Sequence, residues 1–280
     1  MSESAAAMAF AALVGAAVAW PVSRAVLARP PARLMRTNVS GASVPAVLGR
    51  PVVAGGLASI AVMPVVFQLG WDALEPGRVG VTAVILVAAM AAAGTWDDWR
   101  GDERPRGFAG HLAAAGGGRL TGGIVKILAA GGAGLAAGII LHPRDLPMIV
   151  LTIAAVGLGA NLVNLLDRAP GRAGKLTLLA GVPLLVFGDT GWGIAAAGTL
   201  AALAVVLPAD LGERGMLGDA GANPLGALLG LGLAASLDGV ALGAAVAVLL
   251  ALNLASEKWS FSEVIARTPP LRAFDGLGRK

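Results

Sequence analysis

The sequence contains no cysteine, no tyrosine and only two histidines. Disulfides and thiolate metal sites are therefore excluded, and His111 and His142 lie too far apart in sequence to indicate a histidine-rich metal centre. Charged residues make up only 14% of the chain, whereas soluble domains are roughly a quarter charged. Because 56% of the residues are hydrophobic, the composition predicts an integral membrane protein with little room for a soluble domain.

Nine apolar segments are candidates for crossing a bilayer. A membrane helix needs about 20 mostly apolar residues, within a range of roughly 17–25. We therefore predict an all-α, polytopic bundle of about nine transmembrane helices. The predicted spans are 4–20, 52–70, 79–95, 122–141, 147–166, 175–188, 191–207, 221–237 and 239–256. The sixth span is short, at 14 residues, and would be a tilted helix or a half-helix.

The basic residues predict how this bundle is oriented, because cytoplasmic loops collect Lys and Arg. If the N-terminus lies outside, 19 of the 21 Lys and Arg fall on the cytoplasmic side, and only Arg78 and Arg144 do not. We therefore expect a multi-pass protein of the inner (cytoplasmic) membrane with a cytoplasmic C-terminus. The first segment could instead be a cleaved signal peptide, but it lacks the basic start of one and carries Glu3.

Two short polar stretches on the predicted cytoplasmic side carry acids next to a membrane segment. GTWDDWRGD contains the adjacent residues Asp97 and Asp98, and GMLGDAGANPLG contains Asp219 among small, flexible residues. Taken alone, the first could be a solvated helix cap and the second a simple turn.

A third polar stretch, GANLVNLLDRAPGRAGK, lies on the same predicted side. Its residues Asn161, Asn164 and Asp167 follow one another at intervals of three, so on a helix they form a loose row along one face. Such a row could be a polar clamp between helices. Buried polar side chains near a membrane usually face a bundle interior or a wet cavity, so the row could also line a functional site.

Short loops could bring the helix ends that carry these acids to one point. Clustered carboxylates repel one another and persist when a cation neutralises them. Oxygen ligands without cysteine favour a hard cation, Mg²⁺, with Mn²⁺ as the alternative. Surrounding Arg and Lys side chains could hold phosphate oxygens. This combination at the inner leaflet indicates phosphoryl transfer onto or from a lipid.

The order of the motifs DD, NxxNxxD and LGDAGAN resembles the polyprenyl-phosphate N-acetylhexosamine-1-phosphate transferases of glycosyltransferase family 4. Phospho-N-acetylmuramoyl-pentapeptide transferase and the undecaprenyl-phosphate GlcNAc-1-phosphate transferases belong to this superfamily. The segment VPAVLGRPVVAGGLA, residues 44–58, is similar to the family's first cytoplasmic loop and second helix, so the resemblance covers about 44–226. It implies a Mg²⁺-dependent membrane enzyme that transfers sugar-1-phosphate from a UDP-sugar to undecaprenyl phosphate and releases UMP, for cell-envelope polysaccharide or peptidoglycan synthesis.

The resemblance also implies roles for individual residues. Asp97, Asp98 and Asp167 are the expected catalytic residues, and Asp98 and Asp167 join Asp219 as expected metal ligands. The expected substrate-binding residues are Asn161, Asn164, Lys126, Arg168, Arg172, Lys175 and the asparagine of LGDAGAN, which is Asn223 after Ala222.

Two departures from the family pattern leave other functions open. The second motif continues as DRAPGRAGK, where the family has DGxDG, so a basic loop replaces an acidic one. The family's His-rich last loop has no counterpart here, and His111 is a candidate to take the place of its histidines. The alternatives are a scaffold that binds lipid phosphate without catalysis, or a transporter of an anionic solute.

We predict one transmembrane catalytic domain over residues 1–257 and a basic, amphipathic cytoplasmic tail over 258–280. The expected partners are the membrane, a polyprenyl phosphate and a nucleotide-sugar. Nothing in the sequence points to nucleic acid, and a homodimer is compatible with it.

Overall fold

The computed structural model describes residues 2–72, 77–100 and 122–279. Its elements are α1 (Glu3–Ala28), η1 (Ala32–Leu34), β1 (Met35–Thr37), β2 (Ser43–Pro45), α2 (Gly49–Gln68), α3 (Arg78–Arg100), α5 (Gly122–Leu141), α6 (Leu146–Leu166), α7 (Arg172–Phe187), α8 (Thr190–Leu211), α9 (Asp219–Ser236), α10 (Gly239–Lys258), α11 (Phe261–Arg267) and α12 (Pro269–Gly276). The prediction of an all-α bundle is confirmed, with one small β-hairpin in addition. His111 lies outside the described residues.

Each predicted span coincides with one long helix. Within the described parts of the chain, seven of these helices are long and apolar enough to cross a membrane: α1, α2, α3, α5, α6, α8 and α10. The other two, α7 and α9, have 16 and 18 residues. The structure thus supports a multi-pass membrane protein, while the count of nine spans stays a prediction.

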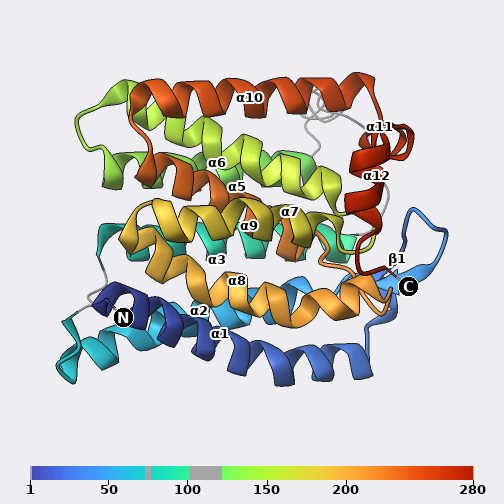
Figure 1. Cartoon of the computed structure of the whole chain (residues 1–280), viewed down its shortest axis with the longest axis horizontal. Helices are drawn as coiled ribbons and strands as arrows, with labels where there is room; N and C mark the ends of the chain where they lie inside the picture. Colours follow the sequence, from blue (N-terminus) through green and yellow to red (C-terminus); the bar gives the residue numbers. More distant parts are fainter. Residues whose placement is uncertain (1, 73–76, 101–121, 280) are drawn as a thin grey trace.

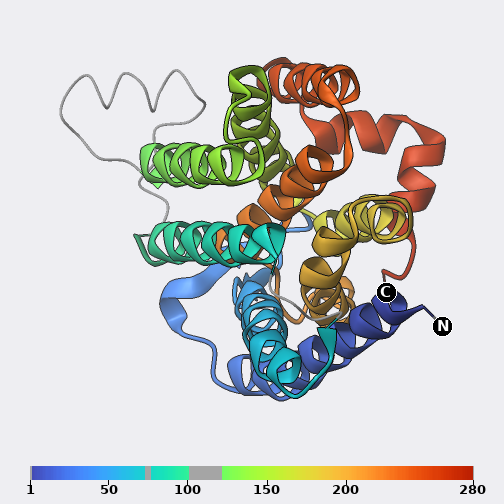
Figure 2. The same cartoon turned by 90° about the vertical axis from the view of Figure 1, so that its left-hand side faces the viewer.

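The long helices run roughly parallel and antiparallel along one direction (Figure 1). Helix α9 lies inside the bundle, where it contacts α2, α3, α6 and α7, and α10 lies at its edge (Figure 2). The absence of a side chain at Gly226 and Gly230 lets α9 approach α6 closely, since a Cβ atom at either position would clash with the α6 backbone. Small residues commonly permit such close packing between membrane helices.

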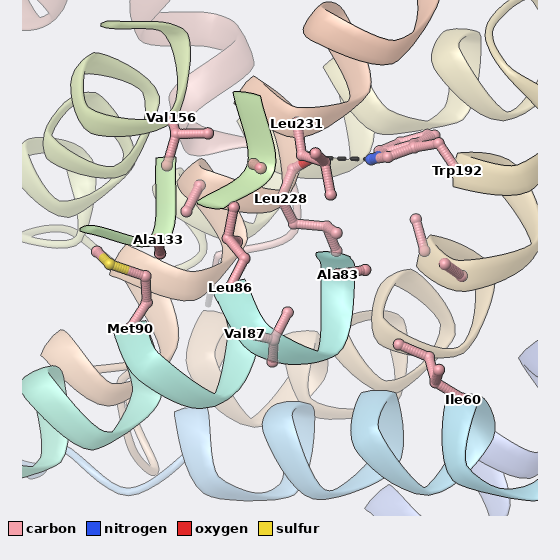
Figure 3. Close-up of a cluster of buried hydrophobic side chains, with 14 of the residues drawn as sticks. Ile60, Ala83, Leu86, Val87, Met90, Ala133, Val156, Trp192, Leu228 and Leu231 are labelled. Carbon is pink, nitrogen blue, oxygen red and sulfur yellow. Dashed lines mark hydrogen bonds between the residues drawn. The ribbon is translucent and has the colours of Figure 1, made fainter. Parts of the chain in front are cut away.

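Among the described residues the buried apolar side chains form three clusters, and the largest draws on most of the helices (Figure 3). Trp192, at the start of α8, is fully buried, and its indole N–H donates a hydrogen bond of 2.8 Å to the carbonyl oxygen of Leu228. The tryptophans near predicted helix ends suggest an aromatic belt at the membrane surface, but Trp192 packs inside the bundle. Its polar atom is satisfied by a backbone group, as buried tryptophan requires.

The outer surface of the bundle carries many exposed apolar side chains. On α5 they include Leu128 and Ile139, and on α10 they include Val240 and Val248, all at least half exposed. Soluble monomers rarely expose apolar patches of this extent. The exposed face of these helices is therefore suited to lipid contact.

One end of the bundle gathers the features that matter for function. At this end, named here the site end, α3, α6 and α8 finish and α5, α7 and α9 begin. The β1–β2 hairpin lies there, and its antiparallel strands pair Met35 with Pro45. The hairpin is fixed to neighbouring loops by a bridge from Ala46 to Met216 and by a hydrogen bond of 3.0 Å from the Val39 N–H to the Arg168 carbonyl.

Candidate functional site

Four aspartates from three helix ends meet at the site end. Asp97 and Asp98 lie in the last turn of α3, Asp167 directly follows α6, and Asp219 is the first residue of α9. Their side chains are buried: Asp97, Asp98 and Asp167 are 2%, 4% and 7% exposed, and the Asp219 side chain is 13% exposed. The sequence motifs that are far apart along the chain therefore form one acidic cluster around the start of α9.

Lys126 from α5 lies inside this cluster. Its ammonium nitrogen is 2.8 Å from Asp97 Oδ2 and 3.1 Å from Asp219 Oδ2. The Lys126 side chain is 17% exposed, so the contact is largely removed from solvent. A single lysine therefore bridges two acids from different helices and marks a position where the cluster stabilises positive charge.

Asp98 and Asp167 instead bind the N-terminus of α9. Asp98 Oδ1 accepts from the Asp219 N–H at 3.2 Å, and Asp98 Oδ2 accepts from the Ala220 N–H at 3.0 Å. Asp167 Oδ2 accepts from the Gly218 N–H at 2.7 Å. The first N–H groups of a helix have no partner within the helix, and the helix dipole favours negative charge there. Both acids thus fix α9 in place as well as adding charge.

Gly218 permits this arrangement through its backbone conformation. Its φ of 69° lies in the left-handed region, which other residues adopt only at a cost. This conformation turns the chain into α9 so that three successive N–H groups point toward the two carboxylates. Asn223, one turn later, donates to the Asp219 carbonyl at 2.8 Å and is 3% exposed.

A fifth acid, Asp210 near the end of α8, lies close to the cluster and is 3% exposed. A cavity of ≈ 10 Å³, about the size of one water, is lined by Asp167 and Asp210 together with the Ala169–Pro170 turn. Burial raises the pKa of Asp167 well above its ordinary value, and the negative charge of Asp210 raises it further. Asp167 is therefore protonated more readily than an ordinary aspartate, and a bound cation would relieve the same repulsion.

Sequence reasoning missed Asp210 and Arg36. The signal for Asp210 was its place at the same predicted side as the other acids, just after the seventh span. Arg36, in β1, donates a hydrogen bond of 2.5 Å to the Asp98 carbonyl oxygen. It also donates to the carbonyls of Arg33 and Met35 at 2.9 Å each, so the guanidinium ties the hairpin to the end of α3.

The predicted substrate-binding residues divide into separate groups. Asn161 donates to Asn253 Oδ1 of α10 at 2.6 Å, away from the acids, and Asn164 is half-buried one turn before Asp167. Arg172 and Lys175 bind the C-terminal tail, whereas Arg168 is exposed. Lys126 contacts the carboxylates of Asp97 and Asp219, and Asn223 contacts the backbone carbonyl of Asp219.

A shallow, open and mainly apolar surface lies along one face of α3 beside the acidic pair. It is formed by Ala91, Ala92, Thr95, Trp96 and Trp99. The Arg100 guanidinium stacks over the Trp96 ring at 4.0 Å from its centroid. An apolar surface with a cation at its end is suited to a lipid chain that carries an anionic head group.

Among the described residues, no group of three or more His, Asp or Glu side chains is arranged to hold a metal ion. The predicted ligand set of Asp98, Asp167 and Asp219 is therefore not pre-formed around a single point. The two carboxylates that converge on a cation are those of Asp97 and Asp219, on either side of the Lys126 ammonium.

Comparison of the chain with family models and with curated proteins found no match to either. The geometry of the site and the order of the sequence motifs are therefore the features that bear on function.

Proposed function

We propose that this protein transfers a sugar-1-phosphate from a nucleotide-sugar, with UDP as the expected nucleotide, to a polyprenyl phosphate and releases UMP. The observation that carries the proposal is the gathering of Asp97, Asp98, Asp167 and Asp219 at the start of α9, with Lys126 in contact with two of them. The order of the three motifs that supply these acids supports the same enzyme class. In this proposal all nine long helices span the inner membrane, and the site end faces the cytoplasm.

The charges of the cluster suit a divalent cation. Asp97 and Asp219 point at the place held by the Lys126 ammonium, while Asp98 and Asp167 are engaged by the α9 N–H groups. Mg²⁺ typically takes one or two carboxylates and completes its shell with water and substrate phosphate. We therefore assign Asp97 and Asp219 as the residues that would hold Mg²⁺. When bound, the ion would neutralise charge on the donor diphosphate.

The protein's own residues would mainly position and neutralise the reacting phosphates. Lys126 would contact donor phosphate oxygens, and the lipid chain would lie against the apolar face of α3 beside Asp97. A lipid phosphate oxygen would then attack the sugar-linked phosphorus in line. As the new P–O bond forms, the bond to UMP breaks and its electron pair leaves with UMP.

The test is an assay of UMP release from UDP-GlcNAc with undecaprenyl phosphate, using purified protein in nanodiscs and Mg²⁺. The wild type should release UMP, and Asp219→Asn should reduce turnover by about 100-fold or more, as expected for lost charge stabilisation. Asp238→Asn is the matched control, because Asp238 caps α10 at the opposite end of the bundle. Turnover by Asp219→Asn equal to the wild type would reject the assigned role.

The same preparation separates the proposal from its alternatives. A lipid-phosphate scaffold would bind undecaprenyl phosphate without releasing UMP from any nucleotide-sugar in a panel. A transporter would show counterflow of an anionic solute in liposomes. Either result, with folded protein and no turnover, would overturn the transferase proposal.

A further inference from the structure

The C-terminal tail, residues 259–279, crosses the site end of the bundle (Figure 1). It has almost no apolar core: none of the α11 residues is buried, and the only buried residue of α12 is the acid Asp275. Leu271, Phe274 and Leu277 are 46%, 39% and 60% exposed. Hydrophobic burial therefore contributes little to holding the tail, and its polar contacts must account for its position.

Asp275 is the centre of these contacts. Arg172, the first residue of α7, binds it through two bonds, from Nε to Oδ1 at 2.8 Å and from Nη2 to Oδ2 at 2.9 Å. Arg279 lies 2.7 Å from Asp275 Oδ1 and also donates to the Pro170 carbonyl at 2.9 Å. A planar guanidinium binds carboxylate and phosphate through the same two-bond geometry.

Lys175, one turn along α7, completes the contact. Its ammonium donates to the carbonyls of Phe274, Asp275 and Leu277 at 3.0, 2.5 and 3.0 Å. These carbonyls belong to the end of α12, where the helix dipole favours a cation. Lys175 and Arg172 thus place two positive charges where the tail presents a carboxylate and partial negative charges.

We propose that Arg172 and Lys175 form a phosphate-binding site that the tail occupies with Asp275, and that the diphosphate of the nucleotide donor displaces the tail. This inference rests on the proposed function, and it adds that the tail competes with the donor diphosphate for Arg172 and Lys175. The turn before Arg172 lines the same small cavity as Asp167, so release of the tail would uncover a basic surface next to the acidic cluster. A diphosphate carries more negative charge than one carboxylate and therefore competes for the same two cations.

The absence of cysteine allows a direct measurement of tail position. Val39→Cys on the hairpin and Leu271→Cys on α12 are both exposed in the parent protein, at 54% and 46%, and can carry a pair of spin labels. In phosphatidylcholine nanodiscs the wild-type background should give one narrow distance distribution. Inorganic pyrophosphate should broaden it at concentrations where KCl of equal ionic strength does not.

Two variants complete the test. Asp275→Asn should weaken tail docking about tenfold or more, the effect of losing a charge-assisted pair. Glu263→Gln removes an exposed carboxylate from the same tail and should leave the distribution unchanged. A narrow distribution in Asp275→Asn, or equal effects of pyrophosphate and KCl, would overturn the proposal. Because the tail has so little buried surface, Asp275→Asn is not expected to disturb the fold, and its thermal midpoint checks this.

Two further comparisons complete the design. One distinguishes a nucleotide from a lipid as the source of the phosphate, and the other distinguishes the tail site from the transferase proposal. Release of the tail by phosphatidylglycerol nanodiscs but not by pyrophosphate would overturn the assignment to the nucleotide and indicate a lipid head group. Release by pyrophosphate in a protein that forms no UMP would support the tail site and reject the transferase. UMP formation with a tail that stays docked would support the transferase and reject the tail site.

Discussion

The acidic cluster and the tail contact lie at the same end of the molecule but have opposite charge balance. In the cluster, Lys126 contacts two of four buried aspartates, so negative charge is in excess. In the tail contact, Asp275 meets Arg172 and Arg279 beside Lys175, so positive charge is in excess. The first arrangement suits a cation as ligand, and the second suits an anion.

The two regions also differ in what their polar contacts support. Asp98 and Asp167 fix the start of α9, a helix that packs mainly on α6 and α3 and also contacts α2 and α7. The tail contact fixes only α11 and α12, which bury almost nothing else. The comparison suggests that the cluster is a permanent part of the fold, whereas the tail contact can open without unfolding the bundle.

The strongest test of this difference is Asp98→Ala. It leaves two buried N–H groups of α9 without their acceptor, and we expect the free energy of unfolding to fall by about 2–4 kcal/mol. UMP release should fall by about 100-fold or more, as expected when charge stabilisation is lost. Thermal unfolding in detergent and the turnover assay measure the two effects.

The matched control for Asp98→Ala is Asp238→Ala. Asp238 accepts a similar hydrogen bond at 2.9 Å, from the Ala241 N–H at the start of α10, but in an exposed position. Its loss should cost about 1 kcal/mol, typical of an N-cap, with no change in turnover. Equal losses of stability in the two variants would contradict the special role of the buried acid.

Lys126→Met tests whether the acidic cluster is a cation site. Without Mg²⁺, the variant loses the ammonium that contacts both the Asp97 and the Asp219 carboxylate, and we expect a loss of about 2–4 kcal/mol. Added Mg²⁺ should raise the melting temperature of the variant more than that of the wild type, because a bound ligand stabilises the folded state. Equal stabilisation of both proteins by Mg²⁺ would argue against a cation site between these two acids.

The helices could be placed from the sequence because each is a long apolar run, but their ends could not. The first span was predicted to end at residue 20, whereas α1 continues to Ala28 through Pro21. The seventh was predicted to end at 207, whereas α8 passes Pro208 and reaches Leu211, which brings Asp210 into the helix. In both cases the helix extends beyond its most apolar part, so hydropathy alone places its end too early.

The site was only partly predictable for a related reason. The four aspartates could be grouped because each lies at a helix end on the same predicted side of the membrane. The partners of Arg172 and Asn161 could not be found, because Asp275 and Asn253 lie 103 and 92 residues further along the chain. No local pattern encodes contacts of that range.

The tail contact should respond to acid, in contrast to the core of the bundle. Burial raises the pKa of Asp275, but the hydrogen bonds and charge of Arg172 and the charge of Arg279 lower it more, so its pKa lies below the ordinary value of 3.8. A lowered pKa means that the docking contribution is complete above the ordinary value and is lost as pH falls through the docked pKa. The spin-label distance should therefore stay constant from neutral pH to about 5 and broaden only in stronger acid. Asp275→Asn should lack this transition, and broadening near neutral pH in the wild type would contradict the assignment.

The smallest effect is expected at a polar contact that belongs to neither region. Asn161 donates to Asn253, whose own amide donates to the carbonyls of Leu158 and Leu249 at 3.2 and 2.8 Å. Hydrogen bonds between membrane helices contribute about 0.6 kcal/mol on average. We therefore expect a small loss of stability in Asn161→Leu, and less in Asn161→Leu/Asn253→Leu, where no partner is left unsatisfied. Turnover should be unchanged in both, because the contact joins α6 to α10 away from the acids. A large loss of turnover without a loss of stability would instead indicate that Asn161 binds the donor, as its motif predicts.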